Sequence, residues 1–369
     1  MGSVTTIALT GGPCGGKSTC LAVLEQELTN KGYKVFVIEE MATNLIKSGV
    51  NPNVISVREF QKMMIKLQYE RHKAYEDMAS KLANDNEKVI LVYDRGIPDC
   101  KAFMSDNMYV EVLNELGLNE NYVLSLYDAA FNLVTVADGV PEAYTCANNS
   151  ARSETPEQAI ERDRGCIRAW TGHTHLRVID NKGRSLKQKV DKLLEEIYSL
   201  LGIPVPVEIE RKYLIKMPDL AVLKSKYDCT TVDIIQTYLE SYDKKAERRV
   251  RQRGVNGNYT FYYTEKRGIS NISREEIEIK LSESEYLELL MDADTTLHQV
   301  KKTRTCFVSE GTYFELDIYP FWKDKAILEV ELTNESSDVI LPEYIDVIKE
   351  VTDDLNYKNV SLANNNGNI

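Results

Sequence analysis

The spacing of apolar residues changes near residue 204, and this change constrains the fold more than any other feature of the chain. Before it, apolar runs such as 4–10 and 88–94 alternate with helical stretches such as 57–83. This alternation predicts an α/β domain, with a parallel sheet and helices on both faces. After it, eight segments with a period of two follow one another between glycine-containing turns, which predicts an antiparallel eight-stranded β-barrel with helices.

The length of the chain and its helix-breaking prolines predict where the two domains begin and end. A chain of 369 residues exceeds what one hydrophobic core usually serves. Pro204 and Pro206 follow the last helical stretch of the first half, and proline stops a helix. We therefore expect domains over 1–203 and 204–363, followed by a polar, disordered tail at 364–369.

Composition argues against several classes of protein. The net charge of −12 argues against a nucleic-acid partner, since neutralising phosphates needs a basic surface. The seven cysteines are scattered and form no CxxC pair, which favours free thiols in a reducing compartment. No apolar run reaches the roughly 18 residues of a transmembrane helix, and we find no signal peptide. We expect a cytoplasmic protein, and the sequence leaves its oligomeric state open.

The segment "GGPCGGKST" (11–19) lies between an apolar strand and a helix, and it fits the pattern GxxxxGK[ST]. Glycines let backbone N–H groups approach phosphates, and the start of a helix adds favourable partial charge. The lysine of this pattern reaches the β- and γ-phosphates, and the hydroxyl after it coordinates Mg²⁺. Ser18 is therefore an expected metal ligand. We expect nucleotide contacts from Gly11, Gly12, Gly15, Gly16, Lys17, Ser18 and Thr19.

Asp94 and Arg152 are the expected catalytic residues of this first site. Asp94 ends the apolar strand 88–94, where a carboxylate can hold Mg²⁺ or its water beside a phosphate loop. A helix-capping Asp is the alternative interpretation. Arg152 precedes a helix start in "ARSETPEQ", and a mobile arginine there would suit phosphoryl transfer. A charged surface helix is the alternative for the arginines that follow it.

Residues 4–201 resemble the P-loop kinase-like AAA domains related to nicotinamide-riboside kinase. The segments that carry the resemblance are "TGGPCGGKST", "DRGIPD", "YDAAFNLVTVADG", Arg152 in "ARSE", and "VIDNKG". The resemblance implies that this domain binds ATP or GTP with Mg²⁺. No motif for a phosphoryl acceptor is recognisable, so a kinase and a nucleotide switch both remain open.

The second half repeats charged residues at positions i and i+2 of successive strands. "EIERK" (208–212), "RVR" (249–251) and "ELD" (315–317) all follow this pattern. In any one strand, a solvated surface is the simpler interpretation. Across the set, like charges would repel one another unless an ion or an opposite strand compensated them. We therefore expect these faces to point inward, so that carboxylates bind hard divalent cations and bases bind a polyphosphate.

Residues 206–363 resemble the CYTH domain, the triphosphate tunnel metalloenzyme fold. The match includes "EIERK", "QTYL", "TEK", "LDIY", "LEVEL" and "VTDDLNYKNVSLA". The resemblance implies that Mg²⁺ or Mn²⁺ is bound by Glu208, Glu210, Glu276, Glu278, Asp317, Glu329 and Glu331. It implies that phosphates are bound by Lys212, Arg249, Arg251, Lys266, Lys302 and Arg304. Lys212 and Glu329 are the expected catalytic residues. Lys212 would orient or deprotonate a water, for which a carboxylate is an equal candidate.

Together the two halves predict a protein with two sites for triphosphate-type molecules. We expect the tunnel to bind a metal–triphosphate and hydrolyse it, while the first domain binds ATP or GTP. The order of the domains also resembles the TRPL translocation defect protein family. That resemblance implies an alternative, a GTP-binding regulator of membrane traffic that holds phosphoinositide headgroups without turnover. A nucleotide cyclase is a weaker alternative.

Overall fold

The computed structural model describes residues 2–139, 155–181, 185–203, 207–241, 246–268, 273–332 and 337–365. The chain divides into two compact units, Met1–Leu194 and Glu195–Ile369, and helix α7 (Leu186–Leu200) crosses the division. The predicted domain boundary near residue 204 stays a prediction. Within the described ranges, no helix is long and apolar enough to cross a membrane.

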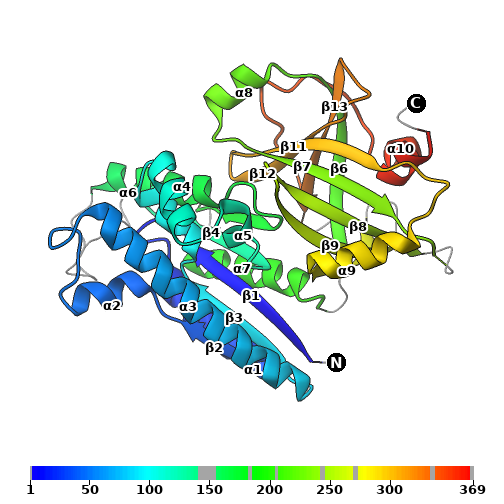
Figure 1. Ribbon diagram of the computed structural model, residues 1–369. Coiled ribbons are helices and arrows are strands. Elements are labelled where there is room, and N and C mark those ends of the chain that lie inside the picture. The colour runs from blue at the N-terminus through cyan, green and yellow to red at the C-terminus, as the bar shows by residue number, and fades with distance from the viewer. Residues whose placement is uncertain are drawn as a thin grey trace. The chain divides into compact units, whose positions relative to one another are not determined.

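The first unit is built on a parallel sheet, which confirms the predicted α/β class (Figure 1). Its strands in the described ranges are β1 (Ser3–Thr10), β2 (Lys34–Ile38), β3 (Lys88–Asp94), β4 (Ala129–Leu133) and β5 (Leu176–Ile179). Their order in the sheet is β2-β3-β1-β4-β5. The apolar centres of β1 and β3 are completely buried, as strands covered on both faces require.

Helices follow the strands of this sheet. They are α1 (Lys17–Asn30), α2 (Met41–Lys47), α3 (Val57–Asn84), α4 (Asp106–Glu115), α5 (Glu120–Leu124), α6 (Pro156–Trp170) and α7. Helix α3 begins where Ser56 Oγ accepts the N–H of Glu59 at 3.2 Å, which satisfies one of the free donors of its first turn. Helix α1 has no side-chain cap, because Gly16 precedes it in a left-handed conformation with φ 90°.

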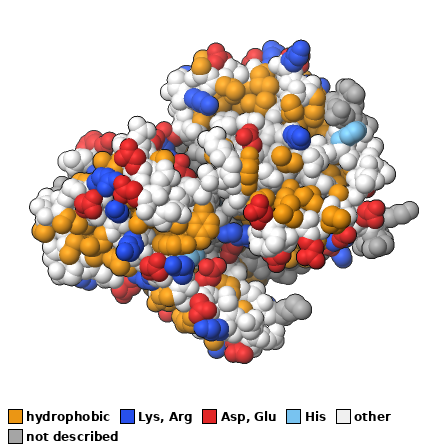
Figure 2. Space-filling view, in the orientation of Figure 1, with side chains coloured by type: hydrophobic (Ala, Val, Ile, Leu, Met, Phe, Trp, Pro, Cys, Tyr) orange, Lys and Arg blue, Asp and Glu red, His pale blue; other side chains and the backbone are white. Residues whose placement is uncertain are grey.

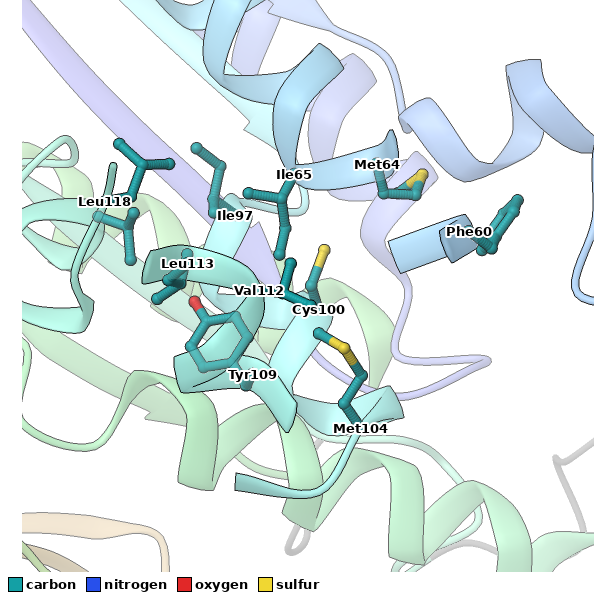
Figure 3. Close-up of a cluster of buried hydrophobic side chains, with 11 residues drawn as sticks. Phe60, Met64, Ile65, Ile97, Cys100, Met104, Tyr109, Val112, Leu113 and Leu118 are labelled. Carbon is teal, nitrogen blue, oxygen red and sulfur yellow. The ribbon is translucent and has the colours of Figure 1, made fainter. Parts of the chain in front are cut away.

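A buried apolar cluster joins α3 and α4 to the 3-10 helix Ile97–Phe103 (Figure 3). It comprises Phe60, Met64, Ile65, Ile97, Cys100, Met104, Tyr109, Val112, Leu113, Leu118 and Val123. Because the 3-10 helix follows β3 directly, this packing also fixes the short segment that connects the strand to it. That segment carries residues of the first candidate site.

The second unit is an antiparallel sheet. Its strands in the described ranges are β6 (Val207–Lys216), β7 (Thr230–Tyr238), β8 (Ala246–Val255), β9 (Asn258–Gly268), β10 (Ser273–Leu281), β11 (Val300–Ser309), β12 (Thr312–Ile318), β13 (Lys325–Leu332) and β14 (Val347–Glu350). Their order is β10-β9-β8-β7-β11-β12-β13-β6-β14. Strand β10 also pairs with β6, from Ser273 opposite Ile209 to Glu275 opposite Val207.

The structure confirms the expected antiparallel, tunnel-like sheet with helices, and it corrects two details of the eight-stranded barrel. The described sheet has nine strands, and it is tunnel-like rather than closed, because β10 and β6 meet over only three residue pairs at one end. Strand β6 is ten residues long, so the rest of the same edge remains for β14. All four residues of β14 are exposed, and this strand therefore lacks the alternation that would have revealed it.

Part of this sheet is buried on both faces. One face of β6 and β11–β13 packs Tyr213, Phe307 and Leu316 in an apolar cluster with Leu223 of α8 (Leu220–Lys226). Because side chains alternate along a strand, the other face carries the charged residues. Helix α9 (Glu283–Leu289) packs on β9 and β10 (Figure 1). Helix α10 (Asn359–Asn365) extends into the predicted tail, and 366–369 lie outside the described residues.

Candidate functional site

The glycine-rich loop of the first unit lies against the end of β4. A Cβ added at Gly11 or at Gly15 would lie 2.3 Å from the carbonyl oxygen of Leu133. Gly11 also has φ 122°, and Gly16 has φ 90°, conformations that other residues rarely adopt. The sequence therefore places glycine where this loop passes close to another backbone and then turns into α1.

Lys17 points back over the loop that precedes it. Its Nζ donates to the carbonyl oxygens of Gly11 at 3.1 Å and Gly12 at 3.0 Å. Burial and the nearby Arg95 guanidinium lower the pKa of Lys17, although Asp94 acts in the opposite direction. Ser18 and Thr19, at the start of α1, are exposed and accessible to a ligand.

Asp94 lies at the carboxyl end of β3, opposite Leu9 of β1. It does not cap a helix, since the residue that precedes the 3-10 helix is Gly96. Asp94 Oδ1 is buried and has no hydrogen-bond partner among the described residues. Burial raises the pKa of this carboxyl, while Lys17 acts to lower it. A buried carboxylate oxygen beside a loop of the phosphate-binding pattern is suited to bind a Mg²⁺ ion or a water of that ion.

A segment after β4 braces the loop from behind. Thr135 Oγ1 donates to the carbonyl oxygen of Pro13 at 2.5 Å, and the N–H of Val136 donates to the carbonyl oxygen of Cys14 at 3.2 Å. Asn181 Nδ2 in turn donates to the carbonyl oxygens of Thr135 at 2.7 Å and of residue 134 at 3.2 Å. These hydrogen bonds come from the segment that directly follows β4, which ends at Leu133.

One buried charged residue holds this loop and a second holds the segment that braces it, and no local spacing predicts either of them. Asp163 of α6 accepts the N–H of Gly12 at 2.6 Å and is 3% exposed. Lys189 of α7 is 2% exposed, and its Nζ donates to the Val134 carbonyl oxygen at 2.5 Å and to Asn181 Oδ1 at 2.9 Å. Both residues occur in charged helical stretches that resemble ordinary surface helices.

Two expected site residues are not placed. Arg152 lies outside the described residues, and so does the side chain of Glu208. The nearby Arg162 of α6 donates to the carbonyl oxygen of Ala102 at 2.9 Å and lies over the ring of Phe103. Arg162 therefore contacts the 3-10 helix.

The tunnel face of the second unit brings three cations and three carboxylates together. They are Lys212, Lys302, Arg304, Glu315, Asp317 and Glu329, each 8% exposed or less. On the outer surface seen in Figure 2, acidic and basic side chains are interspersed in the open. The six charged side chains of the tunnel differ from these because they are buried. Burying a charged group without a partner costs free energy.

Arg304 of β11 binds all three carboxylates of this cluster. Its Nε and Nη2 donate to the two oxygens of Asp317, both at 2.7 Å. Its Nη2 also lies 2.6 Å from Glu329, and its Nη1 binds Glu315. Lys302 binds Asp317 as well.

Lys212 of β6 is the third cation of the cluster. Its Nζ lies 2.6 Å from Glu329 Oε1 and 3.3 Å from Glu210. Burial by itself would raise the pKa of Glu329, but the cations Lys212, Lys302 and Arg304 outweigh it and hold that pKa well below the usual range. Glu329 is therefore a carboxylate at any physiological pH.

Strands β8–β10 carry the remaining expected phosphate contacts. Arg251 binds Glu278 at 2.7 Å, and Lys266 lies 3.4 Å from Glu276. Arg249 lies 3.5 Å from Glu247. The face of β8 thus holds both signs of charge, as does the cluster of β6 and β11–β13.

Two members of the tunnel face were not assigned from the sequence. Arg253 is 4% exposed and continues the spacing of Arg249 and Arg251, so the signal was present in "RVRQR". Glu315 belongs to the charged pattern of its strand, yet it received no role. In the structure it binds Arg304 and pairs in register with Glu329 of β13.

The donor chemistry of the tunnel fits a divalent cation, because carboxylates face one another across strands. Glu315 lies opposite Glu329, and Glu331 lies opposite Glu210. Burial raises the pKa of Glu315, and the neighbouring carboxylates add to this against Arg304, as expected where negative charge is crowded. Among the described side chains, however, no three His, Cys, Asp or Glu converge on one point. Metal binding would therefore draw these carboxylates away from the cations that now hold them.

Two family models match successive parts of the chain. Residues 6–205, more than half of the chain, match the family model of the AAA domain. Residues 207–363 match the model of the CYTH domain. The chain belongs to the AAA domain family and carries a CYTH domain. No curated protein matches the chain, so the resemblance to the TRPL translocation defect family stays a prediction.

The solved structures that are similar to this chain include the following three. The inorganic triphosphatase NE1496 is 30% identical, covers 42% of this chain and 94% of its own, and has a TM-score of 0.30. The PH1819 protein of Pyrococcus horikoshii OT3 is 22% identical, with coverages of 35% and 80% and a TM-score of 0.29. HpAC1 of Hippeastrum, described with a dominant triphosphatase activity, is 15% identical, with coverages of 34% and 80% and a TM-score of 0.27.

Proposed function

We propose that the CYTH domain hydrolyses a triphosphate bound with Mg²⁺ or Mn²⁺ in its tunnel. The observation that carries this proposal is the buried cluster of Lys212, Lys302 and Arg304 with Glu315, Asp317 and Glu329. A metal–triphosphate presents oxygen anions and a hard cation side by side. Buried arginines and lysines suit the first, and carboxylates suit the second.

The chain's own residues divide the work as follows. Arg304, Lys302 and the bases of β8 and β9 bind phosphate oxygens, while Glu210, Glu329 and Glu331 hold the metal. The metal would polarise the terminal phosphoryl group. Lys212 Nζ, which lies near both Glu210 and Glu329, would orient a water or give a proton to the leaving diphosphate.

Phosphate release from tripolyphosphate, ATP and GTP tests this proposal. We expect wild-type turnover with Mg²⁺ or Mn²⁺, a loss of at least ~100-fold in Glu329→Gln, and unchanged turnover in Lys17→Ala. Glu265→Gln is a matched control, because Glu265 lies on the outer face of β9 and pairs with Arg267. Turnover that survives Glu329→Gln, or that disappears in Lys17→Ala, would contradict a tunnel enzyme. Binding of phosphoinositide headgroups without any turnover would favour the regulator instead.

We also propose that the AAA domain binds ATP or GTP with Mg²⁺ through the Lys17 loop. This proposal is supported by the left-handed glycines, by the position of Lys17 over the loop, and by the Asp94 oxygen that lacks a hydrogen-bond partner within the described part of the chain. Calorimetry with each nucleotide in the presence of Mg²⁺ tests it. Lys17→Ala should abolish binding, whereas Lys47→Ala, an exposed lysine of α2, should leave it unchanged.

A further inference from the structure

The ion cluster of the tunnel suggests how its two ligands depend on each other. Every carboxylate of the cluster is bound by a cation of the protein, and one cation, Arg304, contacts all three carboxylates: Glu315, Asp317 and Glu329. All six side chains are buried, so none of them can exchange a lost partner for bulk water without rearrangement.

A metal ion and Arg304 therefore compete for the same carboxylate oxygens. If a divalent cation binds the carboxylates alone, it leaves a buried guanidinium without a counter-ion. If a triphosphate binds Arg304 and Lys302 alone, it leaves buried carboxylates without cations. Removing one member of a buried ion pair is strongly unfavourable, whereas exchanging both partners at once keeps every charge paired.

We propose that metal and triphosphate enter the tunnel by a coupled exchange of ion partners, in which Arg304 weakens the binding of the metal until the triphosphate arrives. This inference rests on the proposed function of the tunnel as a metal–triphosphate site. It adds that Arg304, which helps to bind phosphate, weakens the binding of the metal when no triphosphate is present. Coupling of this kind is reciprocal, so the carboxylates in turn weaken the binding of triphosphate without metal.

The exchange predicts that removing one charge of the cluster tightens the binding of the ligand that carries the same sign of charge. With Mn²⁺ as the probe and no phosphate present, Arg304→Met should bind the ion at least about tenfold more tightly than wild type, measured by the electron paramagnetic resonance signal of free Mn²⁺. With tripolyphosphate as the probe and EDTA present, Glu315→Gln should bind at least about tenfold more tightly, measured by calorimetry. Arg267→Met, an exposed arginine of β9, is the matched control and should change neither affinity.

Unchanged or weaker Mn²⁺ binding in Arg304→Met would overturn the inference. If that variant does not fold, Lys302→Met tests the same competition through Asp317, and the same direction of change is expected. Failure of the proposed function is distinguishable. If the wild type releases no phosphate but Arg304→Met binds Mn²⁺ more tightly, hydrolysis is refuted and the exchange is kept. If the wild type hydrolyses normally but Arg304→Met does not bind Mn²⁺ more tightly, only the exchange is refuted.

Discussion

Lys189, the buried lysine behind the glycine-rich loop, should make the free energy of unfolding of the first unit rise with pH. Burial lowers the pKa of Lys189 to about 8, against 10.5 for an ordinary lysine, although Asp163 acts in the opposite direction. Between these two values the unfolded chain holds a proton that the folded protein has released. The free energy of unfolding therefore increases as the pH rises through this window and is lowest below it.

The size of the effect follows from the two pKa values. A shift of one pKa unit corresponds to about 1.4 kcal/mol, so the contribution of Lys189 rises by about 2 kcal/mol from pH 7 to pH 9.5. The side chain is 2% exposed, so little screening by solvent reduces this figure. Lys189→Met removes the titrating group, and the variant should lack this part of the pH dependence.

Urea unfolding followed by tryptophan fluorescence measures the difference. The chain has two tryptophans, and a Trp322→Phe background leaves the buried Trp170 of α6 as the probe of the first unit. Other titrating groups cancel when Lys189→Met is compared with its parent at each pH. Lys187→Met, an exposed lysine of the same helix, is the control. If the parent and Lys189→Met change equally between pH 7 and pH 9.5, the reasoning from burial is wrong.

Three further predictions address the two sites. Thr135→Val removes the hydroxyl that braces the nucleotide loop and should weaken ATP or GTP binding by about 3- to 10-fold in calorimetry; equal affinities would mean that the brace has no part in binding. Gly15→Ala places a methyl group against the Leu133 carbonyl oxygen and should destabilise the first unit by about 2 kcal/mol or more in urea unfolding, with tripolyphosphate hydrolysis unaffected as the control. EDTA should abolish phosphate release from tripolyphosphate and excess Mg²⁺ should restore it, because the carboxylates of the tunnel are ligands for hard cations; release that persists in EDTA would contradict a metal-dependent tunnel.

The sequence by itself determined the class of each half of the protein. Local pattern was sufficient there, because the strand period and the helix period are properties of neighbouring residues. The glycines of "GGPCGGKST" also follow from local geometry, since a loop with φ 122° at Gly11 and φ 90° at Gly16 excludes most other residues. The alternation in β6, β8 and β12 likewise put the charged residues of each strand on one face.

Tertiary structure decided which of these residues meet. Asp163 binds a loop residue 151 positions away and Lys189 binds a carbonyl oxygen 55 positions away, and no local spacing distinguishes either of them from a surface charge. Arg304 reaches three carboxylates on two other strands only because the register of β11, β12 and β13 aligns them. Strand β14 joins the sheet because part of the edge of β6 is left for it to pair with. This depends on β6 and not on the sequence of β14. Such contacts depend on burial and pairing between distant segments, and these exist only once the chain has folded.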